Sequence, residues 1–458
     1  MKKLLIVILL LPITCFSQII GEAKGGEFKF NQENIPCITE EAKAKINAEV
    51  EVNVANLIKQ GKLSIKKSGL APPTFIWPVQ KSAATEFNDV WAISNYVDHD
   101  AAFPNKLQDY NCGTKTYDTN SGYNHQGTDI FTWPFSWYQQ ENDIAEVVAA
   151  ASGKIVYKND GQFDMSCDFN NNNWNAVYLE HSDGSRTWYG HLKKNSLTTK
   201  NVGDNVVAGE YLGVVGSSGN STGPHLHLEV YDSTNKLVDP FSGNCNDIST
   251  WWQNQPGYSD PNINAVLTHN IAPNFDNPCP QVENTNLANK FLPNTEVFLA
   301  GYFKDQQVGT TVFLRLYYPN GSNIQWSQAM ASNFTTSYWY WSVNNLSALG
   351  TYKFEVNYQG QTVSHEFEVA STLSVEDEKL AKISIAPNPF DGQLKISGFT
   401  FDAADYYISV YNQLGQKVVE KDSFSEQLDL QFLAKGMYFL NLDDKTTGSS
   451  KTFKIVKK

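Results

Sequence analysis

The sequence lacks the features that would place the chain in a membrane or on nucleic acid. Its apolar run at Leu4–Ile13 is shorter than the roughly 18 to 20 apolar residues that a transmembrane helix needs, and no other segment approaches that length. The formal net charge is -13 and there is no basic patch, which argues against nucleic acid as a partner. Because no apolar run is long enough, we expect a mature chain without a transmembrane segment.

The N-terminus has the three parts of a secretory signal peptide. A basic start, Met1–Lys3, precedes the apolar run, and Cys15–Ser17 supplies a small-residue cleavage site. We predict cleavage before Gln18, so that residues 1–17 are the signal peptide. The alternative is a lipoprotein acylated on Cys15, although the leucine expected three residues upstream of it is absent.

Cysteine is scarce as well. Of six cysteines, one lies in the predicted signal peptide, which leaves an odd number in a compartment where cysteines usually pair in disulfides. From proximity in the sequence, we predict disulfides between Cys112 and Cys167 and between Cys245 and Cys279. Cys37 is then left over.

Metal-binding residue types occur in two short motifs and at one isolated histidine. The motifs are His125-Gln-Gly-Thr-Asp129 and His225-Leu-His227, and His191 lies between them after a short aromatic run. Side chains on a strand alternate between faces, so His225 and His227 on a strand would point to the same side. Three separate segments therefore supply the side chains of a catalytic zinc centre with three protein ligands and an open position for water.

The order of these motifs resembles that of the lysostaphin-type zinc endopeptidases, the LytM-type enzymes of peptidase family M23. Members share H-x-x-x-D, an aromatic-x-His-Leu segment, and H-x-H after a Gly-rich run, here at 216–223. The resemblance covers roughly residues 75–245. It implies a mainly β domain of antiparallel sheet, of the duplicated hybrid motif type, which we place at residues 71–250. We expect the Gly-rich run to be a tight turn that positions the following strand.

The same resemblance implies a role for each motif residue. One zinc ion per chain would be bound by His125, Asp129 and His227. His191 and His225 would be catalytic histidines that do not bind the metal, and near neutral pH an imidazole can act either as general base or as oxyanion partner. Which of the two acts as the base is left open.

Residues 18–70 are expected to be a pro-region. They predict one amphipathic helix that follows Thr39 as its N-cap and ends near Lys59. A polar segment between a signal peptide and a secreted enzyme domain is typical of a part that is cut away on activation. Cys37 lies here, either as a plain unpaired cysteine or as a thiolate that occupies the open zinc position and holds the enzyme latent.

A further β-module is predicted at residues 282–370. Alternating apolar residues between turn signals indicate an immunoglobulin-like β-sandwich, and Gly350-Thr-Tyr352 resembles the tyrosine corner of such sandwiches. The aromatic cluster Tyr338–Trp341 could be core on one face and a ligand platform on the other.

The last module, residues 375–458, is predicted to be a small antiparallel β-sandwich. Its order of Pro387-Asn-Pro389, Asn412-x-x-Gly415, Gly436-x-Tyr438 and a Lys-rich end resembles the C-terminal sorting domain of the type IX secretion system. The resemblance implies a Bacteroidetes-type bacterium, type IX secretion machinery as a partner, and a secreted or cell-surface location. The alternative is a plain structural β-domain.

Two functions are compatible with this organisation. The resemblance implies a secreted zinc metalloendopeptidase that hydrolyses peptide bonds in peptidoglycan cross-bridges or in Gly-rich extracellular proteins. We expect it to be monomeric. The alternative is a catalytically retired protease fold that serves as a cell-surface binding or adhesion module. The remaining histidines are assigned structural roles, and they are His99, His181, His269 and His365.

Overall fold

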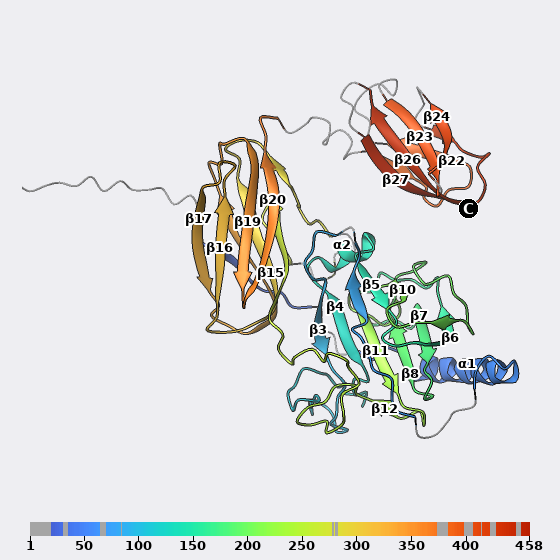
Figure 1. Cartoon of the computed structure of the whole chain (residues 1–458). Coiled ribbons are helices and arrows are strands. Elements are labelled where there is room, and N and C mark those ends of the chain that lie inside the picture. Colours follow the sequence, from blue (N-terminus) through green and yellow to red (C-terminus); the bar gives the residue numbers. More distant parts are fainter. Residues whose placement is uncertain are drawn as a thin grey trace, which may run out of the picture. The chain divides into compact units, whose positions relative to one another are not determined.

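The computed structural model describes residues 20–30, 35–64, 70–83, 85–276, 279, 283–372, 383–397, 406–413, 415–421, 427–445 and 450–458. The predicted signal peptide, with Cys15, lies outside the described residues. The chain divides into two compact units, Met1–Asn289 with Asn294–Phe367, and Lys290–Pro293 with Glu368–Lys458. Strands predominate in both (Figure 1), so the predicted mainly β fold is confirmed. Within the described ranges, no helix is long and apolar enough to cross a membrane.

An eight-stranded antiparallel sheet forms the centre of the first unit. Its order is β3-β4-β11-β8-β7-β6-β9, and β12 pairs with the end of β11. Strands β4, β7 and β8 are buried along their whole length, because apolar side chains pack on both faces of the sheet. The bounds are β3 Trp91–Asn95, β4 Thr128–Thr132, β6 Gly153–Asn159, β7 Ala176–Glu180, β8 Arg186–Gly190, β9 Asn205–Val206, β11 His225–Tyr231 and β12 Leu237–Val238.

Smaller elements complete this part of the unit. A three-stranded sheet has the order β10-β5-β2, and its core residues belong to the same apolar cluster as those of β4 and β11. The bounds are β2 Val79–Lys81, β5 Ala145–Val148, β10 Tyr211–Val214 and the short helix α2 Ser136–Glu141.

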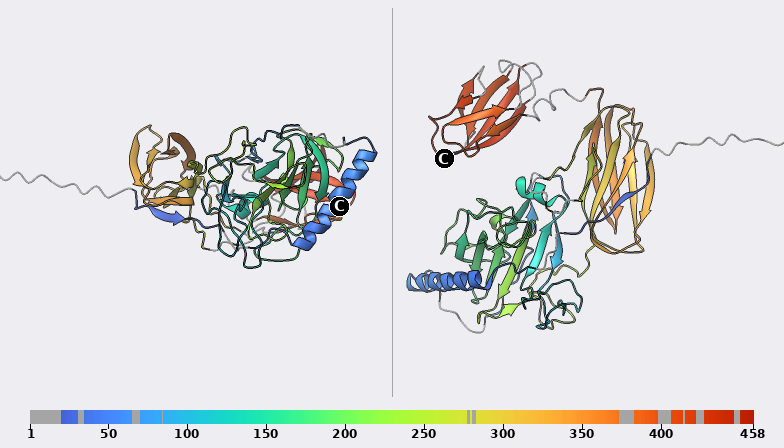
Figure 2. Two further views of the ribbon diagram at one scale, coloured as in Figure 1. Left: turned by 90° about the horizontal axis from the view of Figure 1, so that it is seen from below. Right: turned by 180° about the vertical axis from the view of Figure 1, so that it is seen from behind.

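Helix α1, Glu40–Lys59, lies beside β6 and β8 (Figures 1 and 2). The Thr39 side chain accepts a hydrogen bond from the backbone N–H of Ala42, so the predicted helix and its N-cap are confirmed. The buried face of the helix shares one apolar cluster with the sheet. Its members include Val50, Val54 and Leu57 of the helix and Tyr157, Tyr178 and Trp188 of the sheet.

Two further sheets form a β-sandwich, with orders β1-β18-β15-β13 and β14-β20-β19-β16-β17; all of their strands belong to the first unit except β14 and the last two residues of β20. The predicted tyrosine corner is confirmed, because Tyr352 donates its hydroxyl to the Ala348 carbonyl at 3.0 Å. Strands β1 and β13 join the sandwich from outside residues 282–370. The bounds are β1 Lys24–Glu27, β13 Asn262–His269, β14 Lys290–Phe291, β15 Val297–Gln306, β16 Thr311–Tyr317, β17 Asn323–Ala329, β18 Phe334–Val343, β19 Gly350–Tyr358 and β20 Gln361–Val369.

The second unit is a small β-sandwich with sheets β21-β22-β25 and β24-β23-β26-β27, which share one apolar core. Tyr438 donates its hydroxyl to the Ala434 carbonyl at 2.9 Å, a local arrangement like the one at Tyr352. The bounds are β21 Ser384–Ala386, β22 Gln393–Ser397, β23 Tyr406–Asn412, β24 Lys417–Lys421, β25 Gln427–Asp429, β26 Gly436–Asp444 and β27 Ser450–Lys457.

The disulfide prediction is wrong in both pairs. The structure joins Cys112 to Cys245 and Cys167 to Cys279, across 133 and 112 residues. The loop of Cys112 meets the loop of Cys245 because Tyr110 accepts a backbone hydrogen bond from Cys245 at 2.8 Å. Proximity along the chain is a poor guide here, since a β-fold brings distant loops to one edge.

The structure gives His269 the structural environment predicted for it. Its ring is fully buried, Nδ1 donates to the Thr285 carbonyl at 2.9 Å, and Nε2 accepts from the Tyr302 hydroxyl at 2.8 Å. Burial lowers the pKa of His269 to about 4, although the Thr285 hydrogen bond opposes the shift. The folded state therefore keeps a neutral imidazole that the unfolded chain protonates near its ordinary pKa.

This environment predicts acid destabilisation of the first unit. Because the folded pKa lies below the ordinary 6.5, the contribution of His269 is complete above that pH and is lost as pH falls toward about 4. The loss amounts to about 3 kcal/mol. Urea titrations at pH 7 and pH 4 measure how far the free energy of unfolding drops between the two pH values. This drop should be smaller in His269→Gln than in the wild type by roughly that amount. Equal losses in both chains would contradict the assignment.

Candidate metal and catalytic site

Strand register brings the predicted site residues together. In the central sheet, His227 of β11 lies opposite Asp129 of β4 on one side and opposite Gly190 of β8 on the other. His125 lies three residues before the start of β4, and His191 directly follows β8. Because side chains two apart on a strand share a face, His225 joins His227 on this face. The five residues therefore meet from three segments of the chain, and all are buried.

Each of the three predicted ligands presents an atom to one centre. His125 Nδ1 donates to the Tyr96 carbonyl at 2.7 Å, which leaves Nε2 facing the centre. Burial by itself lowers the pKa of His125, but Asp129 raises it to about 10, so Nε2 must lose a proton when a metal binds. His227 Nε2 donates to Glu229 Oε1 at 3.0 Å, which leaves Nδ1 facing the same centre. Asp129 Oδ2 accepts from Asn95 Nδ2 at 3.0 Å. Such outer hydrogen bonds set ring orientation and tautomer in metal sites.

The separations among these atoms fit a single small ion. His125 Nε2 lies 3.0 Å from Asp129 Oδ2 and 3.3 Å from His227 Nδ1, and His227 Nδ1 lies 2.7 Å from Asp129 Oδ1. Ligands at about 2.1 Å from a zinc ion in a tetrahedron lie roughly 3.4 Å from one another. The two imidazoles and one carboxylate are also a donor set that zinc accepts.

The charge state of Asp129 suits a metal ligand. Burial by itself raises the pKa of a carboxyl group, but the neighbouring His125, His225 and His227 lower the pKa of Asp129 well below its ordinary value. The carboxylate therefore stays ionised in a buried place, where it can offset the charge of a cation.

His191 and His225 form a second pair beside the three ligands, with ring centroids 4.4 Å apart. His191 Nδ1 donates to the Ser218 carbonyl at 2.6 Å, and His225 Nδ1 donates to the Gly223 carbonyl at 2.8 Å. His191 Nε2 is buried without a hydrogen-bond partner in the described part of the chain. Burial and the charge of His225 lower the pKa of His191, which favours its neutral imidazole.

The Gly-rich run supplies the carbonyls that hold this pair. Gly219 has φ of +74°, and a Cβ there would lie 2.9 Å from the Trp174 side chain. Only glycine fits without displacing Trp174, since the left-handed backbone and the close approach both exclude a side chain. The run before β11 is a loop with bends rather than the expected tight turn, and its backbone carbonyls accept from both catalytic candidates.

Sequence reasoning missed Glu229. This buried carboxylate holds His227 from behind and is itself paired with Lys43 of α1 at 3.1 Å. Burial by itself raises its pKa, but Lys43 and His227 lower the pKa of Glu229 to about 2. The signal was present, because Glu229 follows His225 and His227 at the same period of two and so lies on the same face of β11.

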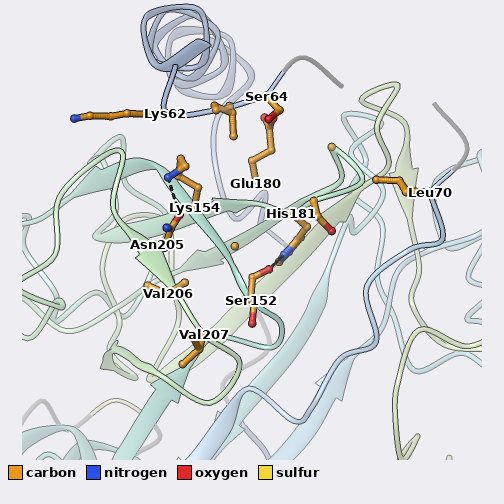
Figure 3. A pocket seen from close by; sticks show the side chains of 14 residues that line it. Lys62, Ser64, Leu70, Ser152, Lys154, Glu180, His181, Asn205, Val206 and Val207 are labelled. Carbon is orange, nitrogen blue, oxygen red and sulfur yellow. Dashed lines mark hydrogen bonds between the residues drawn. The ribbon is translucent and has the colours of Figure 1, made fainter. Parts of the chain in front are cut away.

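A separate pocket of about 590 Å³ lies near the end of α1 and contains none of the five predicted residues (Figure 3). Its histidine, His181, donates or accepts at both nitrogens, with the Ser152 carbonyl at 2.9 Å and Thr187 Oγ1 at 3.1 Å. Both ring positions are occupied, so His181 offers no atom to a ligand.

Comparison with known proteins gives two matches of different kinds. Residues 123–240 match peptidase family M23, and residues 384–458 match the secretion system C-terminal sorting domain. The glycyl-glycine endopeptidase ALE-1 of Staphylococcus capitis is 32% identical over 148 residues, which are 32% of this chain and 33% of that protein. The peptidoglycan DD-endopeptidase ShyC of Vibrio cholerae is 37% identical over 84 residues, 18% of each protein. The chain therefore matches only about a third of the length of ALE-1 and less of the length of ShyC.

Among solved structures, the catalytic domain of lysostaphin from Staphylococcus simulans is 31% identical. The similarity covers 26% of this chain and 78% of that one, with a TM-score of 0.19.

The position of Glu229 predicts an effect on metal affinity. Glu229→Ala should weaken zinc binding about 10- to 100-fold, because His227 loses the group that holds its ring. Glu229→Gln should have a smaller effect, since the amide oxygen still accepts from Nε2. Competition with a chromogenic chelator measures both, with Glu141→Gln on the exposed end of α2 as control. Unchanged affinity in Glu229→Ala would show that His227 is held by other contacts.

Proposed function

We propose that this chain, which contains a peptidase family M23 domain and a secretion-system C-terminal sorting domain, is an exported zinc endopeptidase. The convergence of His125, Asp129, His227, His191 and His225 in one buried cluster supports the proposal. Each histidine in it uses one ring nitrogen for an outer hydrogen bond, so that the other is free for chemistry.

The five residues divide the work of peptide hydrolysis. His125, Asp129 and His227 would hold the metal. When bound, a zinc ion supplies a Lewis acid that lowers the pKa of water toward neutrality and polarises the scissile carbonyl. Of the pair His191 and His225, one imidazole accepts the proton of the attacking water and passes it to the leaving amine. The other donates a hydrogen bond to the carbonyl oxygen as it gains negative charge.

Export is proposed from both ends of the chain. The predicted signal peptide would direct the chain out of the cytoplasm, and the C-terminal sorting domain would direct it to type IX secretion machinery of a Bacteroidetes-type bacterium. The two disulfides fit an oxidising compartment. We place the mature protein outside the cell or on its surface.

Peptidoglycan cross-bridges are the first substrate to test and Gly-rich extracellular proteins the second. Two of the similar proteins are named for glycyl-glycine and peptidoglycan endopeptidase activity. A retired binding protein is less well supported, because none of the five site residues is replaced. The aromatic cluster of the sandwich is also engaged in packing, since Trp341 is buried and the Tyr338 ring lies 4.8 Å from Phe275.

The role assignment predicts different outcomes for a ligand and a catalytic residue. Asp129→Ala should lose zinc and activity together, whereas His225→Ala should keep zinc and lose activity by about 10² to 10⁴-fold. Metal content and hydrolysis rate are measured on residues 71–372, because a boundary at 250 would separate Cys167 from Cys279. Loss of zinc in His225→Ala would overturn the assignment.

A side-by-side assay tests the predicted substrate class. The same fragment is incubated with purified glycine-bridged peptidoglycan and with elastin, each with and without a chelator. Chelator-sensitive release of peptides from peptidoglycan is expected, and restoration by added zinc would identify the metal. Cleavage of elastin alone would indicate that the substrate is extracellular protein rather than peptidoglycan. Failure to cleave either, by a folded fragment with zinc bound, would favour the binding function.

A further inference from the structure

Cys37 lies inside the proposed active site. It is the free cysteine of the described chain and is buried. Its Sγ lies 3.3 Å from His227 Nδ1, the nitrogen that faces the metal centre, and 3.3 Å from the Tyr117 hydroxyl. The sulfur belongs to one cluster with His125, Asp129 and His227 and to another with His191 and His225. It therefore lies between the three ligands and the catalytic pair.

A second observation points to a ligand at this place. His191 Nε2 is fully buried and has no hydrogen-bond partner among the described residues. Its ring lies 5.8 Å from the ring of His227 and 4.4 Å from that of His225. A buried polar atom without a partner is costly, so a group is expected in the space that the sulfur and this nitrogen share.

The chain on either side of Cys37 is anchored independently. Strand β1 adds to the edge of β18, with Lys24 opposite Tyr340 and Glu27 opposite Ser337. After β1, the Phe28 ring stacks on Trp133 at 4.5 Å.

Phe30 continues this contact into the site. Its ring lies 4.8 Å from that of Phe131 on β4 and 5.8 Å from that of His225, in an edge arrangement. The N-terminal segment thus covers the catalytic side of the cluster with aromatic side chains, where a substrate would have to approach.

Helix α1 anchors the chain on the C-terminal side of Cys37, and it contacts the residues that surround the proposed metal ligands. Cys37 lies just before the Thr39 cap, and the apolar face of the helix is buried on the central sheet. Lys43 Nζ lies 3.1 Å from Glu229 Oε2 and also binds Gln126, next to His125. The helix therefore pairs with the carboxylate that orients His227.

We propose that Cys37 is a fourth protein ligand of the metal and that residues 20–30 and 35–64 form a built-in inhibitor of the site. The thiol loses its proton to solvent on binding, and its sulfur takes the position that water needs. A zinc ion with four protein ligands has no open position and is catalytically silent. The latency, although not the ligand assignment, rests on the proposed endopeptidase function.

Cobalt substitution tests the ligand without using activity. The full chain from Gln18 is loaded with one Co²⁺, and a thiolate ligand should give an intense sulfur-to-cobalt charge-transfer band in the near ultraviolet. Cys37→Ser, which keeps the size of the side chain, should lose the band at the same cobalt content. The other described cysteines are in disulfides and give no such band. Identical spectra in the two chains would overturn the proposal.

Activity tests the latency separately. In the full chain, Cys37→Ala should raise the hydrolysis rate at least tenfold, and fragment 71–372, which also lacks the aromatic cover of Phe28 and Phe30, should be at least as active as the variant. Undocking the helix with Val50→Asp and Val54→Asp should both abolish the cobalt band and raise activity. A wild-type chain as active as Cys37→Ala would overturn the latency. A cobalt band without hydrolysis in any variant or fragment would leave the ligand supported and reject the endopeptidase function.

Discussion

The pairing of β11 between β4 and β8 is the constraint on which the site depends. It places His227 opposite Asp129 and next to the strand that leads into His191. Because side chains alternate along a strand, a slip of one residue would turn His225 and His227 to the opposite face. The buried apolar side chains on both sides of the sheet stabilise this register. Packing of the core therefore also sets the geometry of the candidate metal centre.

Backbone carbonyls and one carboxylate complete what the register begins. Tyr96, Ser218 and Gly223 each accept from an inward-lying imidazole, and Glu229 accepts from His227. These partners decide which nitrogen faces the centre. A site built in this way is organised before any metal binds, because outer hydrogen bonds already set the orientation of each ring. The bend at Gly219 would contribute to the proposed catalysis through its backbone alone.

The N-terminal segment, residues 20–30 and 35–64, contacts three parts of the first unit. It supplies an edge strand to the sandwich, aromatic rings to the face near His225, and a helix to the central sheet. Without β1, the edge of β18 would be unpaired, and such an edge tends to associate with other chains, so this strand also protects the folded protein. The same segment places the Cys37 thiol beside the candidate metal ligands, so under the proposed inhibition it would serve folding, protection and control of activity together.

The sequence alone determined the fold class, the helix after Thr39, the tyrosine corner at Tyr352 and the candidate ligands, because these depend on local periodicity, capping and residue type. It did not determine the disulfide partners or the place of Glu229. Nor could it decide whether Cys37 lies beside the candidate ligands, since that sulfur reaches His227 across 190 positions. Contacts of this kind arise only when sheets pack and loops converge, and no local pattern encodes which distant loops meet.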